Sequence, residues 1–427
     1  MGRSLRIAMI SEHASPAAVL GSTDAGGQNV YVDELSRHLG RLGVQVDVFT
    51  RRDAPDLPEV LPWAPNVRIV HVAAGPPAPL PKDELWPLMP LFRDRMLEWL
   101  RRNGLRYDVI HGHFWMSGWV AIELRRRLSV PVVQLFHALG TTKQRHQGSA
   151  DTSPSARIAV ERQIVREVDR VIAQCPAERA ELLRDYAADA ARLVSIAAAV
   201  NPQRFRPVPR AWARAQLGLP LERPIITYVG RMLPRKDVRN IVRALALLVR
   251  EGVAPAPLLL LVGGETADAD PRATPEIGVL QRLTTELGVR DLVRFTGKRQ
   301  PDELYLFYGA ADVVVTTPWY EPFGLTPLEA MACARPVIGA AVGGIRFTVR
   351  HGVTGWLVPP RDPQALAVCL RRALSQPDLR LRMGRAARRR VLRAFTWPLT
   401  ARRTLALYEA LATHQAQAEP AALAVNG

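Results

Sequence analysis

Short apolar segments alternate with helical patterns along almost the whole chain, and this alternation restricts the fold more than any other feature. In the first half, a helix is predicted over residues 26–43 and strands over 6–10, 44–49, 67–72, 108–113, 131–137, 170–174 and 193–197. The second half repeats the pattern, with helices predicted over 237–250 and 275–287 and strands over 225–230, 258–264, 292–297, 312–317, 336–340 and 355–359. Such alternation indicates parallel sheets covered on both faces. We therefore predict an α/β protein with two doubly wound, Rossmann-like domains.

Residues 201–224 separate the two series of strands. This segment contains five prolines and no long apolar period. Proline interrupts regular structure and restricts the residue before it, so we predict an interdomain linker here. The predicted domains are residues 1–203 and 204–395, and residues 415–427 are expected to form a tail.

The composition, with 48% hydrophobic and 23% charged residues, is that of a globular protein. No apolar run reaches the roughly 18–20 residues that span a membrane, and the first residues turn polar too early for a secretory signal. The three cysteines, Cys175, Cys333 and Cys369, contain no CxxC pair, which fits a reducing compartment. We expect a cytoplasmic protein.

The formal net charge is +17, but only four of the 57 basic residues are lysines. An arginine-rich genome explains this bias better than a dedicated binding surface does. Basic runs such as 385–390 fall in helical patterns, and we interpret them as solvent-exposed helix faces. No nucleic-acid motif is present, so no nucleic-acid partner is expected. Residues 88–102 could make a weak peripheral contact with anionic lipid; packing on the first domain is the alternative.

Unusual residues follow the predicted strands at their carboxyl ends, where open α/β sheets bind ligands. Gly26 and Gly27 end a long loop over residues 12–28, and amide groups at the start of the next helix would suit an anion; a simple tight turn is the alternative. The pattern is not GxGxxG, and Arg51 and Arg52 replace the acid that would hold an NAD ribose. This disfavours a nicotinamide dehydrogenase, with an NADP-dependent enzyme as the alternative. We expect two such edges, one from each half, to face each other across an interdomain cleft.

The segment GRMLPRK (230–236) places Arg231 and Lys236 between a strand and a helix. Two cations five residues apart in a loop suit a diphosphate; a solvent-facing pair is the alternative.

The segment YEPFGLTPLEAMA (320–332) is the most informative. Thr326, Pro327 and Glu329 predict a helix start with a capping box, which gives Glu329 a structural explanation. Glu321 has none, because it precedes Pro322 in the loop. A carboxylate so near a helix start can accept hydrogen bonds from sugar hydroxyls.

His111 and His113 share one face of a predicted strand end, with His137 after the next strand. We interpret them as packed or substrate-contacting residues, with a metal triad as the alternative. The sequence Asp268-Ala269-Asp270 lies in a loop rich in proline, alanine and threonine, and we interpret it as solvated. No metal and no cofactor are expected.

Together, the segments GGQNVYV (26–32), DVIHGHFWMSGW (108–119), FHALG (136–140), GRMLPRK and EPFGLTPLEAMA resemble retaining glycosyltransferases of family 4, which have the GT-B fold. The resemblance runs from about residue 5 to residue 410, and the spacing of Glu321 and Glu329 is its most specific element. The sucrose-phosphate synthase-like and inositol-phosphate glycosyltransferase-like branches are the most similar in character.

The resemblance implies a site for a nucleoside-diphosphate sugar in the second half, built by Arg231, Lys236, Glu321, Phe323, Gly324, Leu325 and Glu329. The two cations would bind the diphosphate, and Glu329 the ribose. Glu321 and the three amides that follow Pro322 would hold the sugar and the distal phosphate.

The resemblance also implies roles for the first half. Gly26 and Gly27 would close over the phosphates, and His137 would contact the sugar near the reacting carbon. A phosphorylated acceptor would be held by Lys82, Lys143 and Arg157. A C-terminal helix over 396–414 would cross back to the first domain.

The chain departs from the family at Ala334, Ala199 and Asp237, where relatives usually have glycine. None of these changes removes a donor-site charge. We therefore expect a metal-independent, retaining hexosyltransferase that uses a nucleoside-diphosphate sugar, with UDP-sugar favoured, as co-substrate. Its acceptor would be a hydroxyl of a sugar, sugar phosphate or inositol phosphate, and its catalytic set would be His137, Arg231, Lys236 and Glu321. A nucleotide-sugar 2-epimerase and a non-catalytic sugar-nucleotide scaffold are the alternatives.

Overall fold

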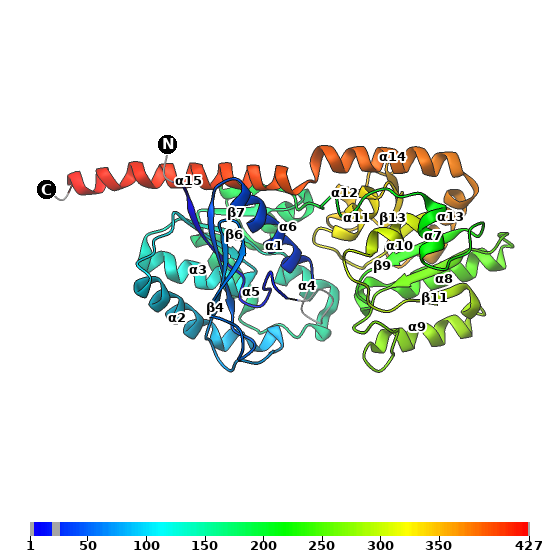
Figure 1. Cartoon of the computed structure of the whole chain (residues 1–427), viewed down its shortest axis with the longest axis horizontal. Helices are drawn as coiled ribbons and strands as arrows, with labels where there is room; N and C mark the ends of the chain where they lie inside the picture. Colours follow the sequence, from blue (N-terminus) through cyan, green and yellow to red (C-terminus); the bar gives the residue numbers. More distant parts are fainter. Residues whose placement is uncertain (1–3, 19–25, 426–427) are drawn as a thin grey trace. The chain divides into compact units, whose positions relative to one another are not determined.

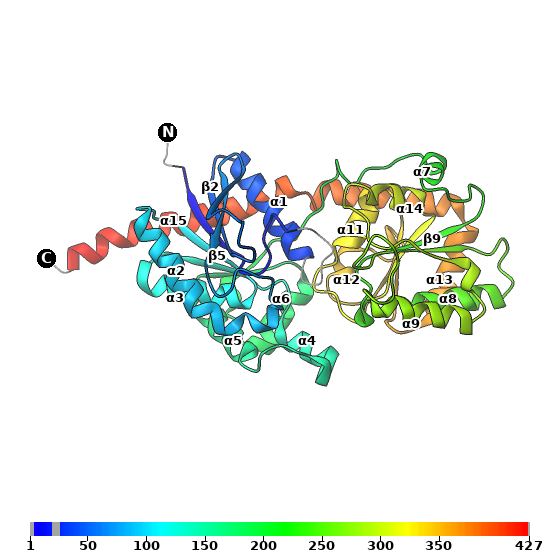
Figure 2. The same cartoon turned by 60° about the horizontal axis from the view of Figure 1, so that its bottom comes forward.

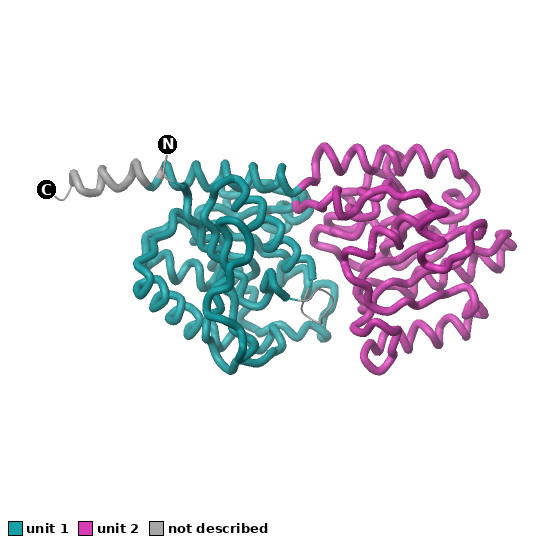
Figure 3. Tube along the Cα trace, viewed as in Figure 1, with its two compact units in different colours: residues 1–19, 24–197, 397–427 teal, residues 20–23, 198–396 magenta. Residues whose placement is uncertain are grey.

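The computed structural model describes residues 4–18 and 26–425 of the chain. Their contacts divide the chain into two compact units (Figure 3). Of the described residues, unit 1 contains those up to Ala197 together with those from Trp397 onward, and unit 2 contains Ala198–Thr396. The C-terminal segment therefore belongs to the same unit as the first half of the chain.

Unit 1 is built on an eight-stranded sheet in the order β3-β4-β2-β1-β5-β6-β7-β8. Every neighbouring pair is parallel except β3 and β4. The strands are β1 Arg6–Ile10, β2 Gln45–Arg51, β3 Val60–Ala64, β4 Val67–Val72, β5 Val109–His113, β6 Val132–Leu135, β7 Arg170–Ala173 and β8 Leu193–Ser195. The central strands are buried on both faces, as their nearly continuous apolar sequences require.

Helices cover the sheet of unit 1 (Figures 1 and 2). α3 packs against α2 and α5, and α1 packs against the C-terminal helix α15. The helices are α1 Gly27–Arg41, α2 Met89–Arg102, α3 Trp115–Leu128, α4 Gly140–Gln147, α5 Arg157–Glu167, α6 Pro176–Tyr186 and α15 Trp397–Val425. Four 3-10 turns are η1 Lys82–Glu84, η2 Trp86–Leu88, η3 Gly148–Ala150 and η4 Ala190–Arg192. The exposed face of α2 mixes acidic and basic side chains, and its apolar face, with Phe92 and Met96, is buried in the core.

Unit 2 is built on a six-stranded parallel sheet in the order β11-β10-β9-β12-β13-β14. The strands are β9 Ile225–Val229, β10 Leu258–Val262, β11 Val293–Phe295, β12 Val313–Thr316, β13 Val337–Ala340 and β14 Gly355–Val358. The helices are α7 Arg210–Gln216, α8 Val238–Arg250, α9 Pro275–Glu286, α10 Leu304–Ala310, α11 Leu325–Ala332, α12 Ile345–Thr348, α13 Pro363–Ser375 and α14 Pro377–Ala394, with 3-10 turns η5 Pro234–Lys236 and η6 Arg290–Leu292. The doubly wound α/β prediction is therefore confirmed.

Each sheet has a point at which the direction of chain progression reverses. In unit 1 this point lies between β1 and β5, and in unit 2 it lies between β9 and β12. Loops that leave neighbouring strands in opposite directions open a crevice at such a point. The predicted site residues of unit 2 follow β9 and β12 directly.

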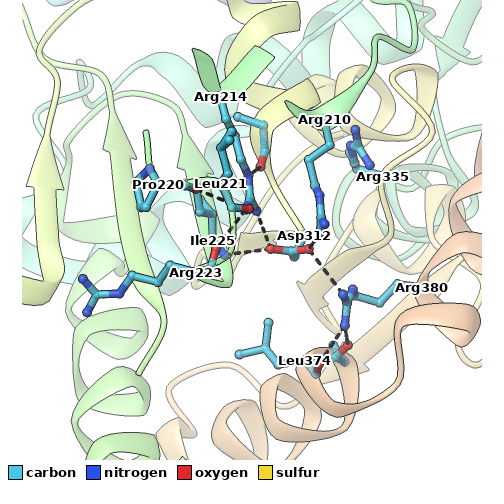
Figure 4. A network of polar contacts seen from close by, with 12 residues as sticks. Arg210, Arg214, Pro220, Leu221, Arg223, Ile225, Asp312, Arg335, Leu374 and Arg380 are labelled. Carbon is cyan, nitrogen blue, oxygen red and sulfur yellow. Dashed lines mark hydrogen bonds and ion pairs between the residues drawn. The ribbon is translucent and has the colours of Figure 1, made fainter. Parts of the chain in front are cut away.

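The segment predicted as a linker, residues 201–224, is instead part of unit 2. Its prolines flank α7, and Arg214 of that helix is buried beside Asp312 at the amino end of β12 (Figure 4). The Asp312 carboxylate accepts hydrogen bonds from Arg214 at 2.6 Å and Arg380 at 3.3 Å, and from the amide of Ile225 at 2.8 Å. The prolines alone could not predict that this segment belongs to unit 2, because Asp312, to which it is bonded, lies about a hundred residues later in the chain.

Strand β3 was not predicted from the sequence. It contains a proline, its residues are mostly half-buried, and it pairs only with β4 through an irregular antiparallel register. Proline is tolerated in such an edge strand because one side of the backbone needs no sheet partner.

Candidate active site

An ion pair between Lys236 and Glu321 lies at the reversal point of unit 2. Lys236 ends the 3-10 turn after β9, and Glu321 lies in the loop after β12. The Lys236 ammonium donates a hydrogen bond to Oε2 of Glu321. Their side chains are only 18% and 16% exposed. Two residues 85 positions apart are thus held together at one edge of the sheet.

The pKa values of this pair show how burial and charge compete. Burial lowers the pKa of Lys236, while the charge of Glu321 acts in the opposite direction. Burial alone would raise the pKa of Glu321, but the charges of Lys236, Arg235 and Arg231 outweigh it and hold that pKa below its usual value. The charges of three cations therefore act on one carboxylate.

Arg235 is a residue of this site that the sequence reasoning passed over. Its guanidinium lies over the Tyr320 ring, 5.2 Å from the centroid. Its Nη1 is buried and, among residues 4–18 and 26–425, has no hydrogen-bond partner. The only signal in the sequence was its place in GRMLPRK, between Arg231 and Lys236.

Two further residues that the sequence reasoning missed, Gly343 and Gly344, support the Glu321 loop. A Cβ at Gly343 would lie 2.0 Å from the carbonyl oxygen of Glu321, and one at Gly344 would lie 2.2 Å from that of Phe323. The amide of Gly344 donates a hydrogen bond to the carbonyl oxygen of Glu321 at 3.0 Å. Only glycine permits this approach of two backbones. The signal was a Gly-Gly pair after a predicted strand.

The predicted capping box at Thr326 is wrong. Helix α11 begins at Leu325, and its N-cap is Gly324 with φ +89°. Glu329 instead accepts a hydrogen bond from the Tyr308 hydroxyl at 2.6 Å, and burial raises the pKa of Glu329 although this hydrogen bond acts against it. Since Gly324 offers no side chain, the first amides of α11 have no side-chain cap. This hydrogen bond connects α10, which carries Tyr308, with α11, which carries Glu329. The sequence around Glu329 does not predict it.

Arg231 follows Gly230, and its carbonyl oxygen accepts a hydrogen bond from the Tyr228 hydroxyl at 2.9 Å. The loop after β9 also packs closely on the loop after β10, because a Cβ at Gly263 would lie 1.9 Å from the carbonyl oxygen of Gly230. These contacts fix the backbone from which Arg231 projects.

In unit 1, Gly26 is the N-cap of α1, and Gly27 is its first residue. The amide of Gly26 donates to Oδ1 of Asn29 at 2.9 Å. Residues 19–25 of the loop predicted over 12–28 lie outside the described residues.

Of the predicted acceptor residues, Lys143 and Arg157 meet at one hydroxyl. Lys143 Nζ lies 2.9 Å from Ser153 Oγ and 2.8 Å from Asp151, and Arg157 Nη1 lies 3.1 Å from the same Ser153 oxygen. Lys82, in η1, precedes Asp83, whose carboxylate lies 3.9 Å from Lys143 Nζ. Three basic residues from separate segments thus belong to one region of unit 1.

Arg157 is almost fully buried. It pairs with Glu161 at 2.9 Å and donates to the Ala138 carbonyl oxygen at 2.7 Å. Its guanidinium also lies 5.0 Å from the centroid of Phe114. It therefore braces the segment that follows His137.

His137 itself has a left-handed backbone, with φ +59°, and its Nε2 lies 3.0 Å from Nδ1 of His113. The prediction that the three histidines lie near one another is correct, since the rings of His111 and His113 are 4.1 Å apart. No cluster of three or more metal-ligating side chains is found among the described residues.

Two of the departures from family glycines occupy left-handed conformations. Asp237, at the start of α8, has φ +51°, and Ala334, just after α11, has φ +56°. A glycine at either position would avoid the steric cost that a Cβ carries in this conformation.

Comparison with known proteins relates the two halves to two family models. Residues 25–204 match "Glycosyltransferase Family 4", and residues 210–390 match "Glycosyl transferases group 1". The chain is 37% identical to the D-inositol 3-phosphate glycosyltransferase of Corynebacterium efficiens, over 96% of both chains, and 40% identical to that of Kineococcus radiotolerans, over 94% of both. The chain belongs to glycosyltransferase family 4. It is a glycosyltransferase.

Solved structures agree with this assignment. The sucrose-phosphate synthase of Thermosynechococcus elongatus is 38% identical to this family 4 chain and superposes with a TM-score of 0.87, over 95% of this chain and 99% of that one. Anabaena HepE in complex with UDP is 19% identical with a TM-score of 0.74, over 95% and 100% of the two chains, and shares the fold. The predicted GT-B fold is confirmed. Within the described part of this glycosyltransferase, no helix combines the length and apolar character needed to cross a membrane.

Proposed function

We propose that this glycosyltransferase moves a hexosyl group from a nucleoside-diphosphate sugar, UDP-sugar being favoured, to an acceptor hydroxyl with retention at the anomeric carbon. The observation that carries the proposal is the half-buried Lys236–Glu321 pair beside the uncapped start of α11. Cations and free amide groups suit phosphate oxygens, and a carboxylate suits sugar hydroxyls.

In this proposal, unit 2 binds the donor. Arg231 and Lys236 bind the diphosphate, and Arg235 adds a third positive charge with an unpaired donor. Glu321 and the amides of Phe323, Gly324 and Leu325 hold the sugar and the distal phosphate. Glu329, oriented by Tyr308, holds the ribose.

The chemistry proposed for these groups is electrostatic. The bond between the anomeric carbon and the diphosphate oxygen breaks, and the lysine and arginine charges stabilise the negative charge that develops on the leaving diphosphate. The acceptor hydroxyl forms the new bond on the same face of the sugar, and its proton goes to the departing oxygen. No step of the proposal uses a metal or another cofactor.

Unit 1 would supply the remaining contacts. Gly26 and Gly27 would approach the phosphates at the start of α1, and His137 would contact the sugar near the reacting carbon. Lys82, Lys143 and Arg157 would hold an acidic acceptor. A sugar phosphate or an inositol phosphate is the proposed acceptor class, supported by the names of the relatives that are 37–40% identical.

A thermal-unfolding screen tests donor binding. UDP, GDP and ADP, and their glucose, mannose and N-acetylglucosamine conjugates, are added to the purified protein. A ligand at 100 times its dissociation constant stabilises the folded state by about 2.7 kcal/mol, so one nucleotide series should raise the unfolding midpoint.

The variant Lys236→Met should lose this ligand-induced rise. Arg371→Met is the matched control, because Arg371 pairs with Glu251 on the surface of the same unit, where both side chains are 41–48% exposed. The control should keep the wild-type response. If no nucleotide raises the midpoint of the folded wild-type protein, the donor assignment is wrong.

A further inference from the structure

Unit 1 contains a buried row of polar rings, which we call the histidine row: Tyr408, His111, His113 and His137. The Tyr408 hydroxyl, from α15, lies 2.6 Å from Nδ1 of His111. The rings of His111 and His113 are 4.1 Å apart on β5, and His113 Nδ1 lies 3.0 Å from His137 Nε2. The row leads from the C-terminal helix to the segment after β6.

We expect all three histidines of the row to be neutral near pH 7. Burial lowers the pKa values of His111 and His137 to about 3, and it lowers that of His113 well below its usual value. The neighbouring imidazoles act in the same direction. A neutral imidazole carries one N–H and one bare nitrogen, so each ring must place its single proton on one of two atoms.

The burial of His113 decides where the protons of the His113–His137 pair lie. Nε2 of His113 is buried and has no hydrogen-bond partner within residues 4–18 and 26–425. If His137 donated from Nε2, the proton of His113 would lie on this unpartnered Nε2. A buried N–H without an acceptor is costly and rare in proteins, whereas a bare lone pair is tolerated more often. The favoured arrangement therefore has His113 donating from Nδ1 to Nε2 of His137.

This arrangement leaves His137 with its own proton on Nδ1. His137 is half-buried, whereas His111 and His113 are completely buried. No described group forms a hydrogen bond with Nδ1 of His137. The ring is held from the side by the edge of Tyr31, with centroids 5.2 Å apart. Its backbone is left-handed, with φ +59°, a conformation that is uncommon among non-glycine residues.

We propose that His113 is a positioning residue that holds His137 in the Nδ1–H tautomer, so that unit 1 presents a fixed, neutral hydrogen-bond donor. In this state Nδ1 can donate to an electron-rich oxygen of a bound ligand and cannot take a proton from an acceptor hydroxyl. The effect on turnover rests on the proposed function, whereas the tautomer itself does not.

Nitrogen-15 NMR of the full-length protein, labelled at histidine, tests the assignment without any ligand. Two-bond proton–nitrogen correlations distinguish the protonated nitrogen of each ring, and a His137→Gln sample assigns the resonances. The expected result is a proton on Nδ1 of both His113 and His137, without titration between pH 5 and pH 8. A proton on Nε2 of His137 would overturn the proposal.

Two substitutions with side chains of similar size test whether His113 determines the tautomer of His137. His113→Asn keeps an N–H donor near the position of Nδ1, and His113→Leu removes it. The leucine variant should show a mixture of His137 tautomers and a kcat about tenfold lower, as expected for one lost hydrogen bond, with little change in the KM of the donor. The asparagine variant should restore the Nδ1–H signal and most of kcat.

A leucine variant with wild-type tautomer and wild-type kcat would refute the positioning role. If either variant fails to fold, the wild-type spectrum still decides the tautomer. If the wild-type protein catalyses no transfer but His137 carries its proton on Nδ1, the proposed function fails and this inference stands.

Discussion

We expect stability and catalysis to respond differently when Lys236 and Glu321 are substituted singly and together. Lys236→Met keeps the length of the side chain but leaves the Glu321 carboxylate without its main counter-charge. Breaking a fully buried pair costs about 3–5 kcal/mol. Because these side chains are 18% and 16% exposed, we expect each of Lys236→Met and Glu321→Gln to lower the free energy of unfolding by about 1–3 kcal/mol.

The double variant Lys236→Met/Glu321→Gln should recover part of this stability, because neither residue of the pair then carries a charge without its partner, while the charges of Arg231 and Arg235 remain. It should not recover activity, since the loss of a preorganised charge at the leaving group costs about 10²–10³ in kcat. Thermal and urea unfolding give the stability terms of the double-mutant cycle, and initial rates of sugar transfer give the kinetic terms.

The pH dependence of Lys236→Met has a defined sign. In the wild-type protein the folded-state pKa of Glu321 is lowered, so its contribution is present above the unfolded value of about 4.3 and is lost as the pH falls through the folded value. The variant should therefore be less stable than the wild type at pH 7, and the difference should shrink in acid. The surface pair Arg371–Glu251 is the control, with a coupling near zero. A Lys236–Glu321 coupling that is equally small, or a double variant with wild-type kcat, would refute the reasoning.

Three further predictions concern stability and are measured by urea unfolding. Asp312→Asn should cost about 3–5 kcal/mol, because it leaves a buried arginine without its counter-charge, whereas Asp302→Asn, at a side chain that is 83% exposed, should change stability by less than about 0.5 kcal/mol; equal effects would contradict the burial argument. Ala334→Gly should stabilise the protein by about 1 kcal/mol, since its φ of +56° strains any residue with a Cβ, and a loss of stability would show that the strain is absent. Tyr408→Phe should cost about 1–3 kcal/mol by leaving a buried histidine nitrogen without its partner, and an unchanged unfolding midpoint would argue against that hydrogen bond.

The parallel sheets could be predicted from the sequence because their strands are short apolar runs with a single interpretation. Within residues 4–18 and 26–425, thirteen of the fourteen strands coincide with predicted segments, within a few residues at the ends. The exception, β3, has a proline and half-buried residues, so its sequence carries no strand pattern. Pairing with β4 determines its structure, and that pairing is a long-range property.

The site residues show the same difference between features that a local pattern predicts and features that depend on long-range contacts. The local sequence placed Lys236 and Glu321 in separate segments, and the family resemblance assigned them to one site; their direct ion pair, between positions 85 residues apart, is seen in the structure alone. Glu329 was assigned to a local capping box, but its partner is Tyr308 on another helix. The role of Gly343 depends on a backbone that approaches to within 2.0 Å of where its Cβ would lie. The Gly-Gly pair signals an unusual backbone, but it does not show which segment comes so close.

The most direct test of the proposed function is the configuration of the product. The purified protein is incubated with the nucleotide sugar that the thermal screen identifies, beginning with UDP-glucose, and with sugar phosphates or inositol 3-phosphate, and the reaction is followed by proton NMR. The proposal predicts an α-linked product and one equivalent of free nucleoside diphosphate, formed only when an acceptor is present. A β-linked product, or an altered donor sugar without any acceptor, would contradict it.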